Sequence, residues 1–431
     1  MDTELLKEIN LLNPWLVKKK QNIFIDGAYI TRLQTDKLLS SAWDRKWLIL
    51  TGPRQAGKTT LGKYLSYLFL KKNRADQVLY LSCDYLAVRN WLKSPAFIQE
   101  AFKQFSLNKP VIFIDEVQRL EHAGLLLKAI ADLKLPIKMI AAGSSQLELR
   151  SKVKEFLTGR NFTSIVLPFS YQEKPELAFD ERAIFGSNPA ICQSTEKRLS
   201  LQQMFSEYID KDIIEILRVG KPDVMQKLIT LVAHSSGQLI QYQHLANDCC
   251  VATATIQNYL AILENTFGIK KITPFVGNKR SEVTANPIYY FIDNGFRNCV
   301  LRNFVGLNLR SDLGLLIESL IFQELYKFNK QHYQDFVIHF WRTTNGAEVD
   351  FVLYRNAKNL LPIEVKYRRF TKPTITRALR SFIQAYKPQQ AIVITRNYIS
   401  AVAIENCQVH FIAAQQLADL FPLLAEFTRD S

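Results

Sequence analysis

The sequence predicts an α/β protein with a parallel sheet near its N-terminus, a helical middle segment and a second α/β region at its C-terminal end. Short apolar runs alternate with helical stretches from about residue 47 to 167, and residues 202–273 have a helical pattern. After residue 288 helices and strands mix again, with the strand-like runs IHFWRT, EVDFVLYR, LLPIEVKY and AIVITR. Short runs that are apolar throughout are typical of strands buried on both faces, as in a parallel sheet covered by helices.

The composition is that of a globular protein. The chain has 431 residues, of which 48% are hydrophobic and 22% charged, so it can bury several cores, and a largely disordered chain is excluded. No uncharged apolar run reaches the roughly 18 residues that cross a bilayer. The first twenty residues lack the pattern of a secretory signal, and the six cysteines do not suggest a disulfide framework. We therefore expect a cytoplasmic protein, without membrane segments, of two or three domains.

The chain is basic, with 55 Lys and Arg against 40 Asp and Glu, a formal net charge of +15. This balance is compatible with a polyanionic partner such as DNA or RNA. A uniformly solvated basic surface explains it equally well, because net charge alone does not locate a patch.

The N-terminal region contains five expected strands, each a short and mostly apolar run. They are residues 47–50 (WLIL), 78–82 (VLYLS), 111–115 (VIFID), 137–143 (IKMIAAG) and 164–167 (SIVL).

A phosphate-binding motif follows the first of these strands. The run GPRQAGKT fits G-x-x-x-x-G-K-[ST], and a helical pattern follows it. Glycines let backbone N–H groups surround phosphates, and the start of a helix adds a favourable dipole. Lys58 is expected to reach the β- and γ-phosphates of ATP, and the Thr59 hydroxyl to ligate Mg²⁺. The residues expected to hold the nucleotide are Gly52, Pro53, Arg54, Gln55, Ala56, Gly57, Lys58, Thr59, Thr60 and Asp115.

Two acids end the third strand, in the run VIFIDEV. Asp115 is expected to hold Mg²⁺ as the acid of a Walker B motif. Glu116 is placed to polarise the attacking water as general base. The alternative is an acid pair in a surface loop.

Two later positions are candidates for sensing or stabilising the γ-phosphate. Ser144, or its neighbour Ser145, follows the strand MIAAG and could contact that phosphate; a helix-capping serine is the alternative. Arg160 could neutralise charge on the transferred phosphoryl group, within the chain or across a subunit interface. An arginine that anchors a helix end or a carboxylate explains Arg160 equally well.

Together the runs GPRQAGKTT, VIFIDEVQRL, AAGSSQLEL, LTGR and LPFSYQE resemble the prokaryotic AAA-superfamily ATPases that carry a C-terminal domain of unknown function. The resemblance covers nearly the whole chain, and the acid pair is typical of the additional-strand class of P-loop ATPases. It implies ATP and Mg²⁺ as ligands, and we also consider self-association through the ATPase domain. One departure is Ser187 in FGSNPAIC, where the family usually has a second glycine.

The middle segment has the pattern of a winged helix. Ile256, Tyr259, Leu260 and Leu263 recur at helical spacing, and the run IKKITPF after them is the expected first wing strand. Gln257 and Asn258 could face nucleic-acid bases, with Lys270 and Lys271 on phosphates. The alternative is packing between domains, which the absence of Lys and Arg from the candidate recognition helix favours.

Acids and a lysine stand on two neighbouring strands of the C-terminal region, within the runs EVDFVLYR and LLPIEVKY. Period-2 alternation puts Glu364 and Lys366 on one face, and Asp350 can meet them across the sheet. This resembles the PD-(D/E)XK nuclease core over about residues 313–396. The resemblance implies a Mg²⁺ site of Asp350 and Glu364, with Glu318 as a further ligand and Lys366 beside it. A structural ion cluster in a fold that has lost catalysis is the alternative.

We therefore expect four parts: a lead-in (1–45), an AAA-type P-loop ATPase domain (46–200), a helical winged-helix segment (201–285) and a nuclease-like α/β domain (286–431). The expected function is Mg²⁺-dependent ATP hydrolysis coupled to nucleic-acid binding or cleavage. The alternative is an ATP-driven regulatory switch whose C-terminal fold is inactive and serves protein interaction.

Overall fold

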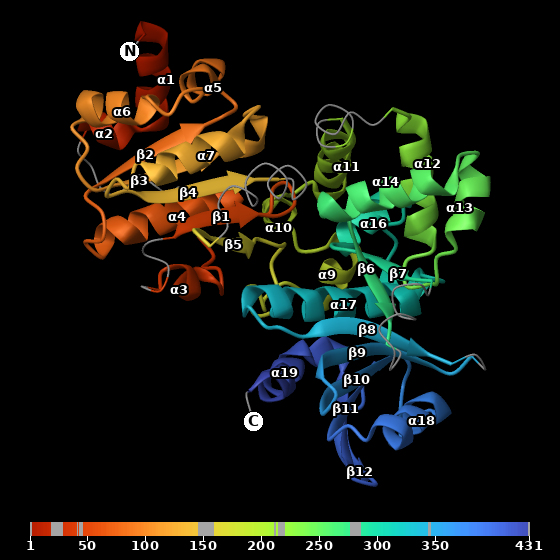
Figure 1. Ribbon diagram of the computed structural model, residues 1–431. Helices are drawn as coiled ribbons and strands as arrows, with labels where there is room; N and C mark the ends of the chain where they lie inside the picture. Colours follow the sequence, from red (N-terminus) through yellow and green to blue (C-terminus); the bar gives the residue numbers. More distant parts are fainter. Residues whose placement is uncertain are drawn as a thin grey trace. The chain divides into compact units, whose positions relative to one another are not determined.

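A computed structural model describes residues 2–18, 29–40, 42, 46–144, 159–210, 213, 220–275, 286–343 and 346–429 (Figure 1). The chain divides into two compact units, Met1–Pro168 and Phe169–Ser431, which are described separately below. Ser145, one of the two serines considered for γ-phosphate contact, lies outside the described residues.

The first unit is built on a five-stranded parallel sheet with the order β2-β3-β4-β1-β5. This confirms the predicted parallel sheet. Strand β4 pairs with both β1 and β3, so one strand is inserted between the strand before the glycine-rich loop and the strand that ends in the acid pair. The strands are β1 Trp47–Thr51, β2 Gln77–Ser82, β3 Pro110–Asp115, β4 Lys138–Gly143 and β5 Asn161–Ile165.

The fifth strand lies three residues earlier than the sequence predicted. It pairs with β1 from Trp47–Asn161 to Thr51–Ile165. Pairing stops at Thr51 because β1 gives way there to the glycine-rich loop. The apolar residues Val166 and Leu167 are buried but lie beyond the strand.

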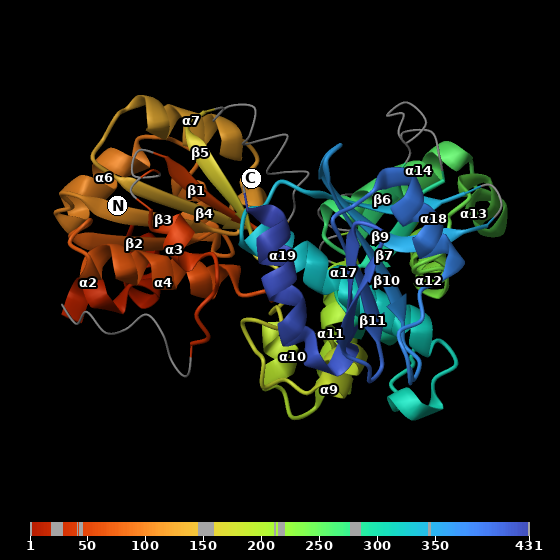
Figure 2. The same cartoon turned by 90° about the horizontal axis from the view of Figure 1, so that it is seen from below.

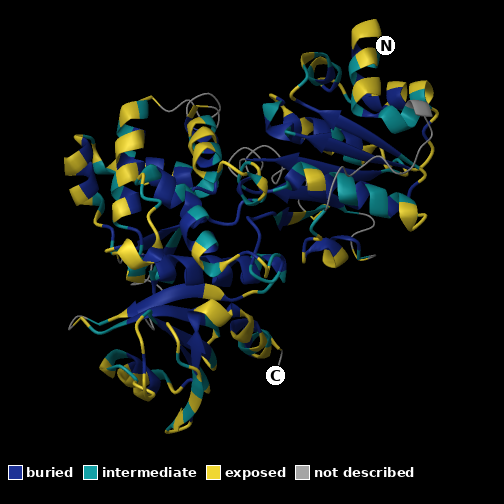
Figure 3. Cartoon of the chain, turned by 180° about the vertical axis from the view of Figure 1, so that it is seen from behind, coloured by how far each residue is buried: buried dark blue, intermediate teal, exposed yellow. Residues whose placement is uncertain are grey.

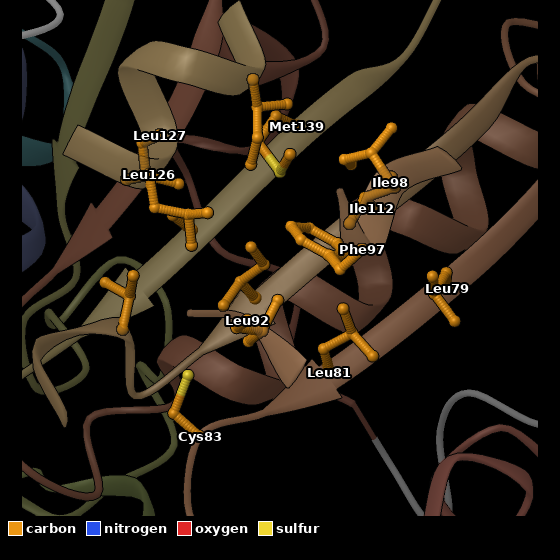
Figure 4. Packing of buried hydrophobic residues seen from close by; sticks show 14 of the residues in the cluster. Leu79, Leu81, Cys83, Leu92, Phe97, Ile98, Ile112, Leu126, Leu127 and Met139 are labelled. Carbon is orange, nitrogen blue, oxygen red and sulfur yellow. The ribbon is translucent and has the colours of Figure 1, made fainter. Parts of the chain in front are cut away.

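Helices cover both faces of this sheet (Figures 1 and 2). The long helix α4 turns Leu61, Leu65 and Phe69, spaced four residues apart, toward one face. Helix α7 contributes Leu126 and Leu127 to the core on the other face (Figure 4). The helices are α1 Thr3–Leu12, α2 Pro14–Lys18, α3 Thr35–Leu38, α4 Lys58–Lys71, α5 Leu86–Trp91, α6 Phe97–Phe105, the 3₁₀ helix η2 Val117–Arg119 and α7 Ala123–Asp132.

The second unit contains an eight-stranded mixed sheet with the order β12-β13-β11-β10-β9-β8-β6-β7. Strands β8, β9 and β10 are antiparallel neighbours, whereas β10, β11 and β13 run parallel. The strands are β6 Ile269–Pro274, β7 Ile288–Phe291, β8 Val337–Arg342, β9 Glu348–Asn356, β10 Asn359–Lys366, β11 Gln390–Thr395, β12 Ser400–Ile404 and β13 Cys407–Ala413.

The sequence predicted β6, β8, β9, β10 and β11 but not β7, β12 or β13. In β12 no residue is fully buried, and β13 carries the polar Gln408 and His410 between buried residues. The polar residues of β13 interrupt the continuous apolar run that marks the central strands. Strand β12 is apolar in sequence but partly exposed along its length (Figure 3), and β7 is buried but only four residues long.

The helices of the second unit pack on both faces of its sheet. Phe322 of α17 contacts Phe351 of β9, while Phe382 of α18 joins a cluster that includes Val352, the next residue of the same strand. The helices are α9 Phe179–Phe185, α10 Pro189–Gln193, α11 Lys197–Glu207, α12 Pro222–His234, α13 Tyr242–Cys249, α14 Thr253–Asn265, α16 Asn294–Val300, η5 Leu307–Leu309, α17 Leu313–Gln331, α18 Arg377–Tyr386, η6 Ala414–Asp419 and α19 Leu420–Thr428.

A buried polar network joins α17 to Phe169, which precedes α9, and to Ser187, which lies between α9 and α10. Lys327 donates to the carbonyl of Phe169 (3.0 Å), to the hydroxyl of Ser187 (2.9 Å) and to Glu324 (3.0 Å). The Ser187 hydroxyl therefore has a structural role as an acceptor for the buried Lys327. The glycine before it, Gly186, has φ +75°, and a Cβ there would lie 1.8 Å from Asp293 Oδ1, so only glycine fits.

None of the helices in the described part of the chain has the length and apolar character needed to cross a membrane.

The core of the first unit gives a stability prediction with a control on the same helix. Leu127 is fully buried, whereas Leu125, two residues before it, is 51% exposed. Leu127→Ala should lower the free energy of unfolding by about 2–5 kcal/mol through lost burial and the cavity left behind. Leu125→Ala should change it by less than about 0.5 kcal/mol. Chemical denaturation of the two variants measures both, and equal effects would contradict the placement of α7.

Candidate functional site

The loop between β1 and α4 has a backbone conformation that requires glycine at two positions. Gly52 has φ +153°, and a Cβ there would lie 2.0 Å from the carbonyl oxygen of Val166. Gly57 has φ +92° and caps the first residue of α4. Gln55 also has a positive φ of 56°. The loop therefore bends tightly and ends at the N-terminus of a 14-residue helix, as the motif predicts.

Lys58 and Thr59, the first two residues of α4, connect this loop to the acid pair. The Lys58 ammonium donates to the carbonyls of Gly52 (3.1 Å) and Pro53 (2.8 Å), so it lies over the loop. The Thr59 hydroxyl donates to Asp115 Oδ2 at 2.6 Å. Two motifs that are 56 residues apart in the sequence thus meet at one point.

Of the remaining loop residues, Ala56 is buried, Pro53 and Arg54 are half-buried, and Gln55 and Thr60 are exposed. Thr60 is the third residue of α4.

Asp115 is held by several donors although it is buried. It accepts hydrogen bonds from Thr59, from the Tyr80 hydroxyl (3.1 Å) and from the Glu116 backbone N–H (3.1 Å). Burial raises the pKa of Asp115, and these donors together with Lys58 oppose that rise. Burial and the neighbouring Asp115 raise the pKa of Tyr80, so the phenol stays a donor.

Glu116 is connected to Ser144 through a residue that the sequence analysis did not single out. The Gln118 amide donates to Glu116 Oε2 and to Ser144 Oγ, the latter at 3.1 Å. Glu116 adopts a positive φ of 52°, which is uncommon for a residue with a side chain. Burial raises its pKa, and Lys58 opposes the rise. No sequence motif indicates Gln118; its role depends on the short 3₁₀ turn η2 after β3.

A second residue outside the motifs braces the loop. Arg32 is buried, and its guanidinium donates to the carbonyls of Ala56 (2.9 Å) and Leu167. Neither Arg32 nor Tyr80 belongs to a recognisable pattern, and only the folded chain places them here.

The structure does not bring Arg160 to this site within the chain. Its carbonyl accepts from the backbone N–H of Trp47, at the start of β1, whereas the loop follows the end of β1. A five-residue strand separates these edges of the sheet by roughly 13 Å, at about 3.3 Å per residue. The Arg160 guanidinium instead forms an exposed ion pair with Asp132 at 2.5 Å. In this structure Arg160 therefore does not reach the loop, and its role in phosphoryl transfer, in cis or in trans, stays a prediction.

The residues of the loop and acid pair fit a magnesium-bound nucleoside triphosphate. Backbone N–H groups at a helix N-terminus, one ammonium, one hydroxyl and one carboxylate are the donor set that such a ligand requires. The N-terminus of α4, Lys58, Thr59 and Asp115 supply these groups, and their hydrogen bonds bring them together.

A second group of ionisable residues lies on β9 and β10 of the second unit. Lys366 Nζ lies 3.1 Å from Glu364 Oε1 and 3.5 Å from Asp350 Oδ2, so the three predicted residues converge. The carboxylates have other donors as well: Asp350 accepts from the Val365 backbone N–H (2.6 Å), and Glu364 from the Thr376 hydroxyl (2.9 Å). The expected common face of Glu364 and Lys366 agrees with these contacts.

Burial governs the ionisation of this group. Burial raises the pKa values of Asp350 and Glu364, and Lys366 opposes both rises. For Lys366, burial alone would lower the pKa, but the two carboxylates outweigh it and the pKa is raised. Lys366 is therefore charged and holds the carboxylates together.

Glu318 of α17 is close enough to Asp350 to interact electrostatically, but it has its own partner. Its Oε1 accepts from the Tyr290 hydroxyl at 2.5 Å. Burial, with the Asp350 charge next in size, raises the pKa of Glu318 to about 8. A carboxyl group with this pKa is largely protonated at neutral pH.

The described residues contain no group of three or more His, Cys, Asp or Glu side chains that could hold a metal ion. The expected three-carboxylate set of Glu318, Asp350 and Glu364 is therefore not assembled in this structure. The reason lies in the contacts: Glu318 is bonded to Tyr290, and the Lys366 ammonium lies where it meets both other carboxylates.

In the middle segment, helices α12, α13 and α14 pack around a core that includes the predicted Ile256, Tyr259, Leu260 and Leu263. Gln257 and Asn258 are exposed on α14. Lys270 of β6 forms an ion pair with Glu264. Strand β6 pairs with β7, but it also joins β8 in the larger sheet.

Comparison with known families agrees with the geometry of the first site. Residues 44–174 match the model of an AAA domain. Residues 176–306 and 313–412 match two domains of unknown function, DUF8612 and DUF4143. The chain thus carries an AAA-type P-loop ATPase domain followed by two domains of unknown function. The ATPase domain implies ATP binding.

Three relatives with similar sequences carry the name uncharacterized protein. An uncharacterized protein of Mycobacterium tuberculosis is 24% identical over 340 residues, covering 78% of this chain and 73% of that protein. One of Haemophilus influenzae is 22% identical over 387 residues, covering 84% and 92%. One of Methanocaldococcus jannaschii is 26% identical over 381 residues, covering 78% of each.

Two solved structures share weak similarity. Replication initiator DnaA bound to AMPPCP and single-stranded DNA has a TM-score of 0.26 at 14% identity, covering 54% of this chain and 86% of that one. PCH-2 of C. elegans has a TM-score of 0.23 at 16% identity, covering 60% and 69%.

The raised pKa of Glu318 gives a pH-dependent stability prediction. Because the folded-state pKa lies near 8, above the ordinary 4.5, this group favours the folded state at low pH and loses that contribution as pH rises toward 8. Glu318→Gln removes the charge but keeps an oxygen for Tyr290. We expect the variant to be more stable than wild type at pH 8.5 by up to about 5 kcal/mol, at about 1.4 kcal/mol per pKa unit.

At pH 5 the difference should nearly vanish. Urea denaturation at both values measures it, with the exposed Glu426→Gln as the control for loss of one carboxylate from the same unit. A variant that is less stable than wild type at pH 8.5 would contradict the prediction.

Proposed function

We propose that this protein hydrolyses ATP with Mg²⁺ and uses the nucleotide state to control its C-terminal region. The observation that carries the proposal is the direct contact of Thr59 with Asp115 under a glycine-rich loop capped by Lys58. This contact joins the phosphate-binding and acid motifs at the edge of a parallel sheet where ligands of such sheets bind.

Each residue has a distinct role in this proposal. Lys58 would exchange its carbonyl partners for phosphate oxygens, and Thr59 and Asp115 would hold Mg²⁺. Mg²⁺ supplies neutralisation of the phosphate charge. Glu116 accepts the proton of the attacking water, which requires that its carboxylate leave the Gln118 amide. Because Gln118 also donates to Ser144, a phosphate contact at Ser144 would shift Gln118 and thereby Glu116.

The same proposal includes self-association of the ATPase domain. Arg160 is exposed and held by an ion pair that is itself exposed, and such pairs contribute little stability. A neighbouring subunit could therefore recruit it to its own phosphate site. We also propose the four-part division at residues 45, 200 and 285 as the functional organisation of the chain.

Two substitutions should separate nucleotide binding from hydrolysis. Lys58→Ala should weaken ATP binding roughly tenfold to a hundredfold, because a charge-assisted contact is lost. Glu116→Gln should still bind ATP but hydrolyse it about 10²–10⁴ times more slowly, because Asp115 remains while the base is gone. Labelled-nucleotide binding and phosphate release measure the two effects.

Lys71→Ala, an exposed lysine at the other end of α4, is the matched control and should bind and hydrolyse ATP like wild type. Undiminished turnover in Glu116→Gln would remove that residue from the base role. Wild-type affinity in Lys58→Ala would remove the loop from nucleotide binding.

For the C-terminal region we propose action on DNA or RNA, with Asp350, Glu364 and Lys366 as the working residues. The support is their convergence on two neighbouring strands, next to the exposed basic residues Arg368, Arg369 and Lys372. Basic side chains in such a run can follow a phosphate backbone. Gln257 and Asn258, exposed on α14, are further candidates for base contacts.

A second candidate is a regulatory switch whose C-terminal fold is inactive and binds another protein. One observation favours it: Lys366 satisfies both carboxylates where a bridging cation would otherwise be needed, and Glu318 is engaged by Tyr290. In this reading the ion cluster holds β9 and β10 together and has no chemical role.

A cleavage assay distinguishes the two candidates. The full chain is incubated with Mg²⁺ or Mn²⁺, with and without ATP, on plasmid DNA and on RNA. Under the first candidate the nucleic acid is cut, and Lys366→Ala abolishes cutting while Lys358→Ala, exposed in the turn between β9 and β10, does not. Binding should also weaken steeply as salt rises. Binding without cleavage, or no binding in low salt, would leave the regulatory switch as the better explanation.

A further inference from the structure

A cavity of about 640 Å³ lies in the first unit, at the edge of the sheet where its strands begin. Its walls include Trp47 at the start of β1, Lys138 at the start of β4 and Lys109 just before β3. All five strands are parallel, so the glycine-rich loop, which follows β1, lies at the opposite edge. This cavity is therefore separate from the nucleotide site.

The lining of the cavity has one sign of charge. Five of its described lining residues are basic, and none of the lining residues that the structure describes is acidic. The basic residues are Lys46, Arg74, Lys109, Lys134 and Lys138. Two acids lie near this group: Asp76 accepts from the Lys109 backbone N–H (3.0 Å), and Asp132, which interacts electrostatically with Lys134, forms an ion pair with Arg160.

For two of these basic side chains the surroundings disfavour the charged form. Burial, with the charge of the neighbouring Arg74 next in size, lowers the pKa of Lys138 to about 8. Burial also lowers the pKa of Arg74. Like charges gathered in a poorly hydrated cavity repel each other, and an anion would relieve that repulsion.

The uncharged part of the wall is apolar and aromatic. Phe69 lies beside the half-buried Arg74 and the buried Lys138, with the Arg74 guanidinium 4.8 Å and the Lys138 ammonium 5.4 Å from its ring centre. Trp47 and Ile137 complete this side. A cavity of this volume is within the range of small-molecule sites, which combine apolar walls with a few converging polar groups.

The C-terminal ends of two helices account for only some of the basic residues that line the cavity. α4 and α7 end at Lys71 and Asp132, near this edge, and helix C-termini attract cations. Lys138, however, belongs to a strand and donates to the carbonyl of Lys46 at 2.8 Å, and Lys109 precedes a strand. The convergence of cations from three strand starts onto one cavity is not required by the helices.

We propose that this cavity binds a phosphorylated small molecule that carries an apolar or aromatic group. Its phosphate contacts the exposed Lys109 and Lys134 at the entrance, with Arg74 and Lys138 behind them, and its apolar part lies against Phe69 and Trp47. The ligand is distinct from the ATP of the glycine-rich loop, and its binding would act on the starts of the same strands β1, β3 and β4 whose ends carry the nucleotide site.

Calorimetric titration of the full chain tests this, in a Lys58→Ala background so that the glycine-rich loop contributes little. The probes are 1-naphthyl phosphate and inorganic phosphate. Lys109→Ala with Lys134→Ala should weaken binding of 1-naphthyl phosphate at least tenfold. The matched control, Lys71→Ala with Lys72→Ala, removes two exposed lysines that do not line the cavity and should change binding less than twofold.

1-Naphthyl phosphate should bind at least tenfold more tightly than inorganic phosphate, because it buries apolar surface against the aromatic wall. Equal affinity for the two probes would overturn the apolar part of the proposal. Absence of binding, or equal losses in the two double variants, would overturn the site itself. Lys109 and Lys134 are exposed, so neither substitution disturbs the core.

Discussion

A charge that is removed from water has to be met by an opposite charge or by hydrogen-bond donors, and this constraint shapes both units of the protein. In the first unit Asp115 is buried and receives three donors, one from helix α4, one from the neighbouring strand β2 and one from the next backbone N–H. In the second unit Lys327 and Glu324 are both fully buried and satisfy each other together with the backbone of the segment before α9. Loss of one partner in either place would leave a buried charge alone.

The parallel sheet gathers the nucleotide site because parallel strands end at one edge. β1 supplies the glycine-rich loop and β3 supplies Asp115 and Glu116. Strand β4, inserted between them, ends in Ser144. This insertion sets the spacing at which Gln118 reaches both Glu116 and Ser144. The same geometry puts Arg160 at the other edge of the sheet, in an ion pair with Asp132.

The carboxylate cluster of the second unit fits two interpretations, a structural one and a catalytic one, because Lys366 is suited to both. Lys366 neutralises Asp350 and Glu364, which is what a structural ion cluster requires and also what a phosphate-cleaving site needs near its carboxylates. Glu318, with a pKa raised to about 8, differs from the other two because a protonated carboxyl makes a poor cation ligand. The ionisation state of Glu318 is therefore central to which reading holds.

The sequence by itself determined the class of the first unit and most of its strands. A glycine-rich motif and continuous apolar runs are local patterns, and local backbone chemistry fixes their structure. It also predicted that Glu364 and Lys366 share a face, since strand alternation is local. Only the tertiary structure decided the positions of Arg32, Tyr80 and Gln118, the separation of Arg160 from the loop, and the failure of Glu318 to join a three-carboxylate set. These depend on strand order and on competing hydrogen-bond partners far away in the chain, and no short segment of sequence carries that information.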